Sequence, residues 1–176
     1  MGSTIVNLII EVIMKYEPKK KIGKLCLASI VFGVLKRGVK VCYKHDSRVR
    51  AILDRLPDGY VLALRVLPEK PIMMLKKVEG KIVNAHKGDK IDLEVCFKNV
   101  DVAIPVLLGQ MAIGDTYKHS SIITYGSVGD TVEIVECLNI VESYLFPKFI
   151  TSKIMNTTYK KEVSSARIYL GVLLGV

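Results

Sequence analysis

Two hydrophobic periods divide the 176-residue chain. Apolar residues recur at helical intervals in the first 56 residues and again after residue 99, whereas the stretch between residues 60 and 97 is strand-like, with alternating apolar and polar positions. A block of strands enclosed by helices, without regular alternation of the two, is typical of an α+β domain.

The N-terminal part predicts helices at residues 4–16 and 22–35, and Gly38 is the expected end of the second helix. Residues 39–43 alternate apolar and basic side chains, which leaves open a short strand or an extended link. A further helix is predicted at residues 47–56, where the apolar side chains share one side and a Pro-Asp-Gly turn follows.

The central part predicts four strands. They cover residues 60–67, 72–78, 81–86 and 90–97. Tight turns join the first three strands, so we expect an antiparallel meander. The strict alternation of the fourth strand requires that one of its faces be buried.

After the fourth strand, Asn99 or Asp101 can cap a helix that carries Pro105 in its first turn. A last short strand is expected at residues 122–125, and glycines then release the chain into a helix at residues 130–146. Two further helical pieces are predicted at residues 150–155 and 163–174.

The stretch from the fourth to the fifth strand resembles the sterol-carrier-protein-2-like (SCP-2) lipid-transfer domain. The matching runs are Asp92-Leu-Glu-Val-Cys-Phe97, Ala103-Ile-Pro-Val-Leu-Leu-Gly109 and Ile122-Ile-Thr-Tyr-Gly126. Gly126 matches a glycine of that family, whereas Ser127 stands where the family has an acidic residue, and Ser120-Ser121 replace its Gly-Lys. The resemblance covers about residues 45–146.

The resemblance implies one domain over residues 1–176, with a largely antiparallel sheet of about five strands covered on one face by helices. Its core is expected at residues 45–146, with extra helical regions at residues 1–44 and 147–176. The implied function is non-catalytic binding or transfer of a fatty acyl, sterol-like or isoprenoid lipid in an apolar tunnel between sheet and helices.

Eight apolar residues are the candidates for the lining of this tunnel. They are Leu93, Val95, Phe97, Ile104, Leu107, Leu108, Met111 and Ile123. Burial of an acyl chain needs only continuous apolar surface, which contributes about 0.8 kcal/mol for each methylene. Flexible thioethers at Met73, Met74 and Met111 favour an adaptable pocket.

Composition leaves two other functions open. Half of the residues are hydrophobic, only 7% are aromatic and none is Trp, so Val, Ile, Leu and Met build the interior. Apolar periodicity cannot distinguish a hollow interior from a packed one. The alternatives are therefore a self-association module with a solid core and an accessory domain that presents an acyl substrate to a partner enzyme.

The net charge of +9 attracts anionic partners. Basic residues concentrate at residues 19–24, 36–44 and 70–90. This field fits acidic membranes, nucleic acid or acidic ligands, and equally a solubilising surface. Because the tyrosines are dispersed, we expect no specific nucleic-acid binding.

Residues that could carry enzyme chemistry are scattered, so we expect no catalysis and no metal or cofactor. Cys26, Cys42, Cys96 and Cys137 lie far apart among apolar residues and are expected to be reduced, buried thiols. The pair His45 and Asp46, and His119 near Tyr117, fit surface or capping roles better than catalysis. Residues 126–129 lack a phosphate-loop pattern and fit a strand-to-helix turn.

The apolar tail at residues 166–176 fits packing over the core or a homodimer contact better than transient contact with a membrane surface. The longest apolar run, residues 25–35, is shorter than the roughly 20 residues of a transmembrane helix. The N-terminal residues show no secretory signal, so a cytoplasmic protein is expected.

Overall fold

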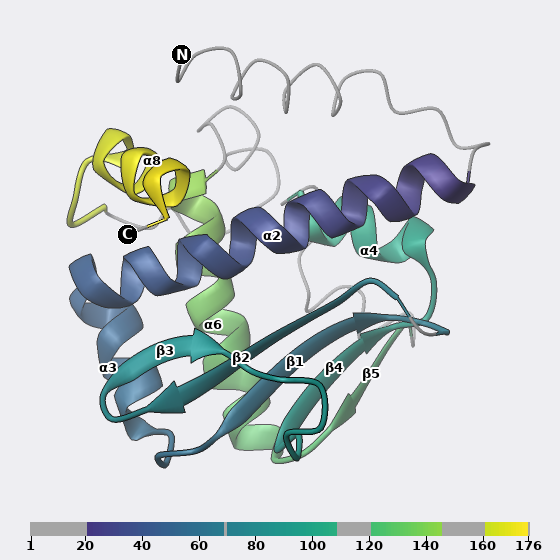
Figure 1. Cartoon of the computed structure of the whole chain (residues 1–176), viewed down its shortest axis with the longest axis horizontal. Helices are drawn as coiled ribbons and strands as arrows, with labels where there is room; N and C mark the ends of the chain where they lie inside the picture. Colours follow the sequence, from purple (N-terminus) through teal and green to yellow (C-terminus); the bar gives the residue numbers. More distant parts are fainter. Residues whose placement is uncertain (1–20, 69, 109–120, 146–160, 176) are drawn as a thin grey trace.

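The structure is a computed structural model of the chain and describes residues 21–68, 70–108, 121–145 and 161–175. Figure 1 shows a sheet with helices stacked on one of its faces. The helices are α2 (Lys21–His45), α3 (Ser47–Arg55), α4 (Val100–Leu107), α6 (Val128–Leu145) and α8 (Ser165–Leu174). The strands are β1 (Val61–Val66), β2 (Ile72–Val78), β3 (Lys81–Asn84), β4 (Leu93–Phe97) and β5 (Ile122–Tyr125).

The sheet has five strands in the order β3-β2-β1-β4-β5. The pairs β1–β2, β2–β3 and β4–β5 are antiparallel, and β1–β4 is parallel. The predicted meander is β1–β2–β3. The α+β class and the largely antiparallel five-stranded sheet are thus confirmed.

The sheet face toward the helices is built from cross-strand rows of apolar side chains. Because residues in register point to the same face, strand pairing defines each row. The rows are Leu75, Leu62 and Leu93; Met73, Leu64 and Val95; and Val66, Phe97 and Ile122. All nine belong to one core with the buried sides of α2, α3, α4, α6 and α8. The core therefore lies between the sheet and its helical layer.

Helix α2 differs from the prediction, because it continues through Gly38 to His45 and includes residues 39–43. Gly38 is a packing position: a β-carbon there would lie 2.8 Å from Leu145 Cδ1 and 3.0 Å from Val141 Cγ1. The glycine lets α2 approach α6 closely, and it does not end the helix. Neither the predicted stop nor a strand at residues 39–43 is correct.

Other boundaries follow the expected capping chemistry. Asp46 caps α3, where its side chain accepts hydrogen bonds from the backbone N–H groups of Arg48 and Val49. Asn99 rather than Asp101 caps α4. The predicted strands 72–78 and 122–125 are confirmed with the same bounds.

Some predictions lie outside the described residues. These are the helices at residues 4–16 and 150–155. The division into regions 1–44, 45–146 and 147–176 stays a prediction. Helix α8 confirms a helical segment near the C-terminus, and its Ile168 and Val172 are buried. No described helix is long and apolar enough to cross a membrane.

Candidate functional site

Helix α2 and strands β2 and β3 form the candidate functional site. In Figure 1, α2 crosses above these strands along the length of the sheet. Three hollows follow the helix on this side, and each is lined by α2 together with residues of β2, β3 or their loops. The unbroken 25-residue helix therefore joins sites that a stop at Gly38 would have separated.

The first hollow is apolar at its base and has a volume of about 310 Å³. Helix α2 contributes Phe32 and Gly33, and the chain at the start of β2 contributes Pro71, Ile72 and Met73. A β-carbon at Gly33 would meet no atom within 4 Å, so the helix leaves open space at this point. The polar side chains of the rim are Ser29, Lys36 and Lys70.

The second hollow is a narrow apolar crevice of about 20 Å³ between α2, α3 and the first three strands. Its walls include Val39, Leu53, Leu62, Leu75 and Ile82. This volume holds about one water molecule. The crevice is therefore a small packing defect between the sheet and the helices.

The third hollow, here called the basic basin, has a volume of about 850 Å³ and lies between α2, α3, the β2–β3 turn, β3 and α8. Among the described residues, six cationic side chains line it, and Asp54 is the single carboxylate. The cations are Lys36, Arg37, Lys40, Lys44, Arg50 and Lys81. Lys36 also lines the apolar hollow, so the two sites are neighbours along α2.

Hydrogen bonds fix the walls of the basic basin. Lys40 Nζ donates to Asn84 Oδ1 at 2.7 Å and thereby links α2 to the end of β3. Tyr43 Oη donates its single hydrogen to Asp54 Oδ1 at 2.6 Å, and the carbonyl oxygen of Gly80 lies 3.1 Å from the same Oη. Burial and the Asp54 carboxylate raise the pKa of Tyr43 to about 12, so its phenol stays protonated.

Arg50 of α3 caps the C-terminal end of helix α2. Its guanidinium donates to the carbonyl oxygens of Tyr43 at 3.1 Å and Lys44 at 2.7 Å. These carbonyls belong to the last turn of α2, where helical partners are missing and a positive charge is favourable. The guanidinium of Arg50 therefore already has hydrogen-bond partners in the wall of the basin.

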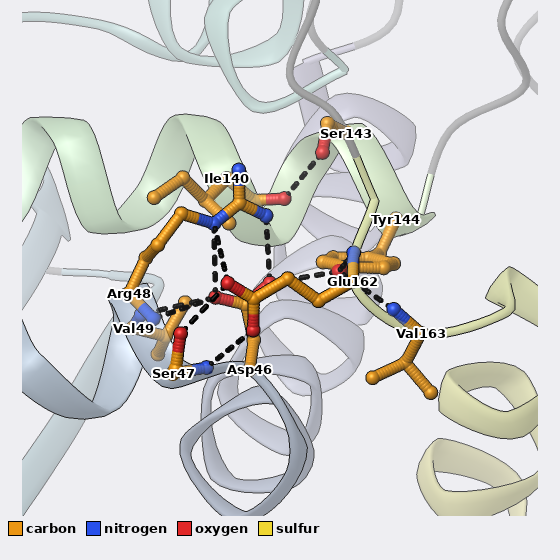
Figure 2. Close-up of polar contacts among 9 residues, drawn as sticks. All are labelled: Asp46, Ser47, Arg48, Val49, Ile140, Ser143, Tyr144, Glu162 and Val163. Carbon is orange, nitrogen blue, oxygen red and sulfur yellow. Dashed lines mark hydrogen bonds and ion pairs between the residues drawn. The ribbon is translucent and has the colours of Figure 1, made fainter.

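The buried carboxylate of Asp46 links α3 to α6, and Figure 2 shows its polar contacts. It accepts hydrogen bonds from Arg48 Nη2 at 2.7 Å and from Tyr144 Oη of α6 at 2.7 Å, besides its capping bonds to α3. Tyr144 Oη in turn accepts from the backbone N–H of Glu162 at 2.9 Å. The Glu162 carboxylate also contacts α3, because it accepts a hydrogen bond from Ser47 Oγ at 2.7 Å.

Two opposing effects act on the pKa of Asp46. Burial, the larger single effect, disfavours the charged carboxylate, but the hydrogen bonds from Arg48, Tyr144 and the Val49 backbone together outweigh it. The pKa of Asp46 consequently lies below its ordinary value. None of the hydrogen bonds of this network that the described residues make involves the imidazole of His45.

Six of the eight predicted lining residues come together in the core. They are Leu93, Val95, Phe97, Ile104, Leu107 and Leu108, each at most 2% exposed. They form part of the same packed cluster between β4 and the helices, and none of them lines the three hollows along α2. Whether a ligand enters among them stays a prediction.

The other two lining candidates lie elsewhere. Met111 is outside the described residues. Ile123 pairs in register with Cys96, whereas its neighbour Ile122 pairs with Phe97. Ile122 therefore shares the core face with Phe97, and Ile123 points to the opposite face of the sheet.

The described residues contain no group of His, Cys, Asp and Glu side chains that could hold a metal ion. All four cysteines are free; Cys42, Cys96 and Cys137 are buried, but Cys26 is exposed, contrary to the prediction. Burial raises the pKa of Cys42 to about 12 and also raises that of Cys137, so both stay thiols. The described site offers apolar surface and fixed positive charge, which suit non-covalent binding.

No protein-family model matches the sequence, and no curated protein matches it. Solved structures similar to the chain include "UbiJ-SCP2 Ubiquinone synthesis protein", with a TM-score of 0.46 and 13% identity over 66% of this chain and 96% of that one. Sterol Carrier Protein 2 from Yarrowia lipolytica, in its apo form, gives a TM-score of 0.46 and 14% identity over 62% of this chain and 88% of that one.

A third similar structure is palmitated SCP2L2 from Aedes aegypti, with a TM-score of 0.35 and 14% identity. It covers 56% of this chain and 91% of its own. These structures carry the name of the family that the sequence resembles.

Proposed function

We propose that the protein binds a hydrophobic small molecule non-covalently between helix α2 and the sheet. The observation that supports this function is the apolar hollow of about 310 Å³ formed by Phe32, Gly33, Pro71, Ile72 and Met73. Its volume falls at the lower end of the roughly 300–1,000 Å³ of small-molecule pockets. Eight methylenes buried there would contribute about 6 kcal/mol before the costs of association.

The polar rim favours a chain with an anionic end, such as a fatty acid. Lys36 and Lys70 place two ammonium groups at the rim of an otherwise apolar base. A carboxylate could pair with these groups in the solvent while the chain remains in the hollow. We therefore propose an amphipathic acyl ligand ahead of a neutral sterol-like one.

The deeper lining predicted from the sequence extends this proposal. Met73 of the hollow lies in the same cross-strand row as Leu64 and Val95. A chain longer than the hollow would next meet this row, which leads to Leu93 and Phe97 on β4. Carriage of a long acyl chain would require the helices to move away from these residues.

The first prediction uses Gly33→Leu to fill the hollow from α2. The space around Gly33 admits the new side chain, and leucine favours a helix by up to about 0.8 kcal/mol over glycine. We expect the variant to be as stable as the wild type or more stable, with at least tenfold weaker binding of a fluorescent fatty acid. Equilibrium titration measures the affinity, and thermal unfolding measures the stability.

Gly23→Leu is the matched control. Gly23 lies on the same helix, also has open space around it, and lines none of the three hollows. The control should gain helix stability and keep the wild-type affinity. Equal affinities of the Gly33 and Gly23 variants would contradict a ligand in this hollow, and a wild type that binds no fatty acid would contradict the function.

A further inference from the structure

The basic basin concentrates charge that the apolar hollow does not need. Six cations and one carboxylate line the basin, so it carries more than half of the chain's net charge of +9. The carboxylate of Asp54 is already engaged by the Tyr43 hydroxyl at 2.6 Å. The basin therefore has a large excess of positive charge within its own walls.

The lysines of α2 form a row. Lys36, Lys40 and Lys44 are spaced four residues apart, and such positions are neighbours on one face of a helix. Lys81 on β3 faces the same basin. The ammonium groups of Lys36, Lys44 and Lys81 make no hydrogen bond or ion pair with any described residue.

This row is electrostatically costly without an anion. Burial lowers the pKa of Lys40, and the charges of Lys36 and Arg37 lower it further. Like charges four residues apart destabilise a helix. An anion bound among the lysines would remove this repulsion and would be held by charge-assisted hydrogen bonds.

The shape of the basin selects the kind of anion. A hollow of about 850 Å³ encloses a small ligand more readily than a flat membrane or a duplex. The described lining residues offer no exposed aromatic face for stacking a nucleic-acid base, because Tyr43, the only aromatic residue among them, is 8% exposed. Cations on both α2 and β3 can contact separate anionic groups of one ligand.

We propose that the basic basin binds a ligand that carries at least two linked phosphate groups. Phosphate oxygens accept several charge-assisted hydrogen bonds at once, and a diphosphate matches cations distributed over opposite walls. The basic basin shares Lys36 with the apolar hollow, but binding of a diphosphate in the basin does not require a ligand in that hollow. The phosphates could belong to a soluble compound, or to the head group of a lipid whose chain enters the neighbouring hollow past Lys36.

The test measures binding of inorganic pyrophosphate by isothermal titration calorimetry at constant ionic strength. The wild type should bind one pyrophosphate per chain, more tightly than it binds sulfate. The double variant Lys36→Gln/Lys44→Gln should bind pyrophosphate at least about tenfold more weakly than the wild type, because it loses two charge-assisted contacts. Because these lysines have no partners among the described residues, thermal unfolding should show equal or higher stability.

The charge-matched control is Lys87→Gln with Lys90→Gln, two exposed lysines outside the basin. Its pyrophosphate affinity should stay within about twofold of the wild type, because long-range fields are screened by salt. Equal weakening in the two double variants would overturn the proposal. So would a wild type that binds pyrophosphate no more tightly than sulfate.

Farnesyl diphosphate and farnesol distinguish the two sources of phosphate. If the phosphates belong to a lipid head group, farnesyl diphosphate should bind more tightly than pyrophosphate, and Gly33→Leu should remove this difference in affinity. If they belong to a soluble compound, the two diphosphates should bind with equal affinity, and Gly33→Leu should have no effect on either. Either pattern supports the basin, provided that the Lys36 and Lys44 substitutions weaken it. Farnesol binding alone would support the proposed function and overturn the basin as a phosphate site.

Discussion

Asp46 shows how one buried residue fixes several elements. Its side chain is fully buried, caps α3, pairs with Arg48 and accepts the Tyr144 hydroxyl of α6. Tyr144 then receives the backbone N–H of Glu162 beside α8. The loss of this carboxylate would therefore affect three segments at once: α3, α6 and the chain at Glu162.

We predict that Asp46→Asn destabilises the protein at neutral pH by about 1–3 kcal/mol. Asparagine can still cap α3, but it loses the charge-assisted bonds to Arg48. Because the pKa of Asp46 is lowered on folding, its stabilising effect is complete above the usual carboxyl range and is lost as pH falls through the folded-state pKa. The variant should approach the wild type in stability below about pH 4.

Denaturant unfolding of both proteins at a series of pH values measures this difference. Asp46→Ala is a second comparison, since it also removes the cap and should be less stable than Asp46→Asn at every pH. A gap between wild type and Asp46→Asn that is the same at pH 3 and pH 7 would show that the carboxylate is not held in its charged form.

Single residues also show what a sequence can and cannot indicate. The thioether of Met73 indicates an adaptable side chain, and Met73 lines the apolar hollow; whether this pocket adapts to a ligand stays a prediction. The role of Gly38 is mispredicted because a glycine that ends a helix and one that admits a neighbouring helix look the same in a sequence. Only the approach of Leu145 and Val141, more than 100 positions away, distinguishes the two roles.

At the scale of elements, α8 depends on a second close approach. A β-carbon at Gly171 would lie 2.7 Å from Val41 Cγ1 and 3.1 Å from its Cγ2. Val41 is buried and β-branched, so it cannot rotate away easily. This contact keeps α8 against α2, where Gly171 and Gly175 line the basic basin.

We predict that Gly171→Ala destabilises the protein by about 1 kcal/mol or more, although alanine favours helix formation. Overpacking costs about 1–3 kcal/mol, which exceeds the gain in helix propensity of up to about 1 kcal/mol. Hydrogen exchange should show faster exchange in α8. When Val41 is already alanine, Gly171→Ala should lower the free energy of unfolding by less than it does in the wild type. Simple additivity of the two substitutions in unfolding free energy would contradict the proposed contact.

The elements themselves were largely predictable, because each carries its own period. The strand-like period of residues 72–78 and the short run at residues 122–125, followed by glycines, predict β2 and β5 with their observed bounds. The basin was predictable only in part: the cluster at residues 36–44 is visible in the sequence, but its convergence with Arg50 and Lys81 depends on packing. The apolar hollow likewise joins α2 to the loop before β2.

For the whole molecule, the sequence predicted the α+β class and a helical layer on one face of the sheet. It also predicted where an apolar ligand would be expected, between these layers. The described structure adds two neighbouring hollows along α2, one apolar and one basic. Together they suit a ligand with an apolar chain and an anionic end.

Native mass spectrometry of the gently purified protein is the decisive test of lipid binding by this chain. We predict a non-covalent adduct with the mass of a fatty acid or isoprenoid lipid, which is released on denaturation and is strongly reduced in Gly33→Leu but not in Gly23→Leu. A wild type that appears only at its bare mass, and that takes up no fatty acid or farnesyl diphosphate when these are added, would contradict lipid binding.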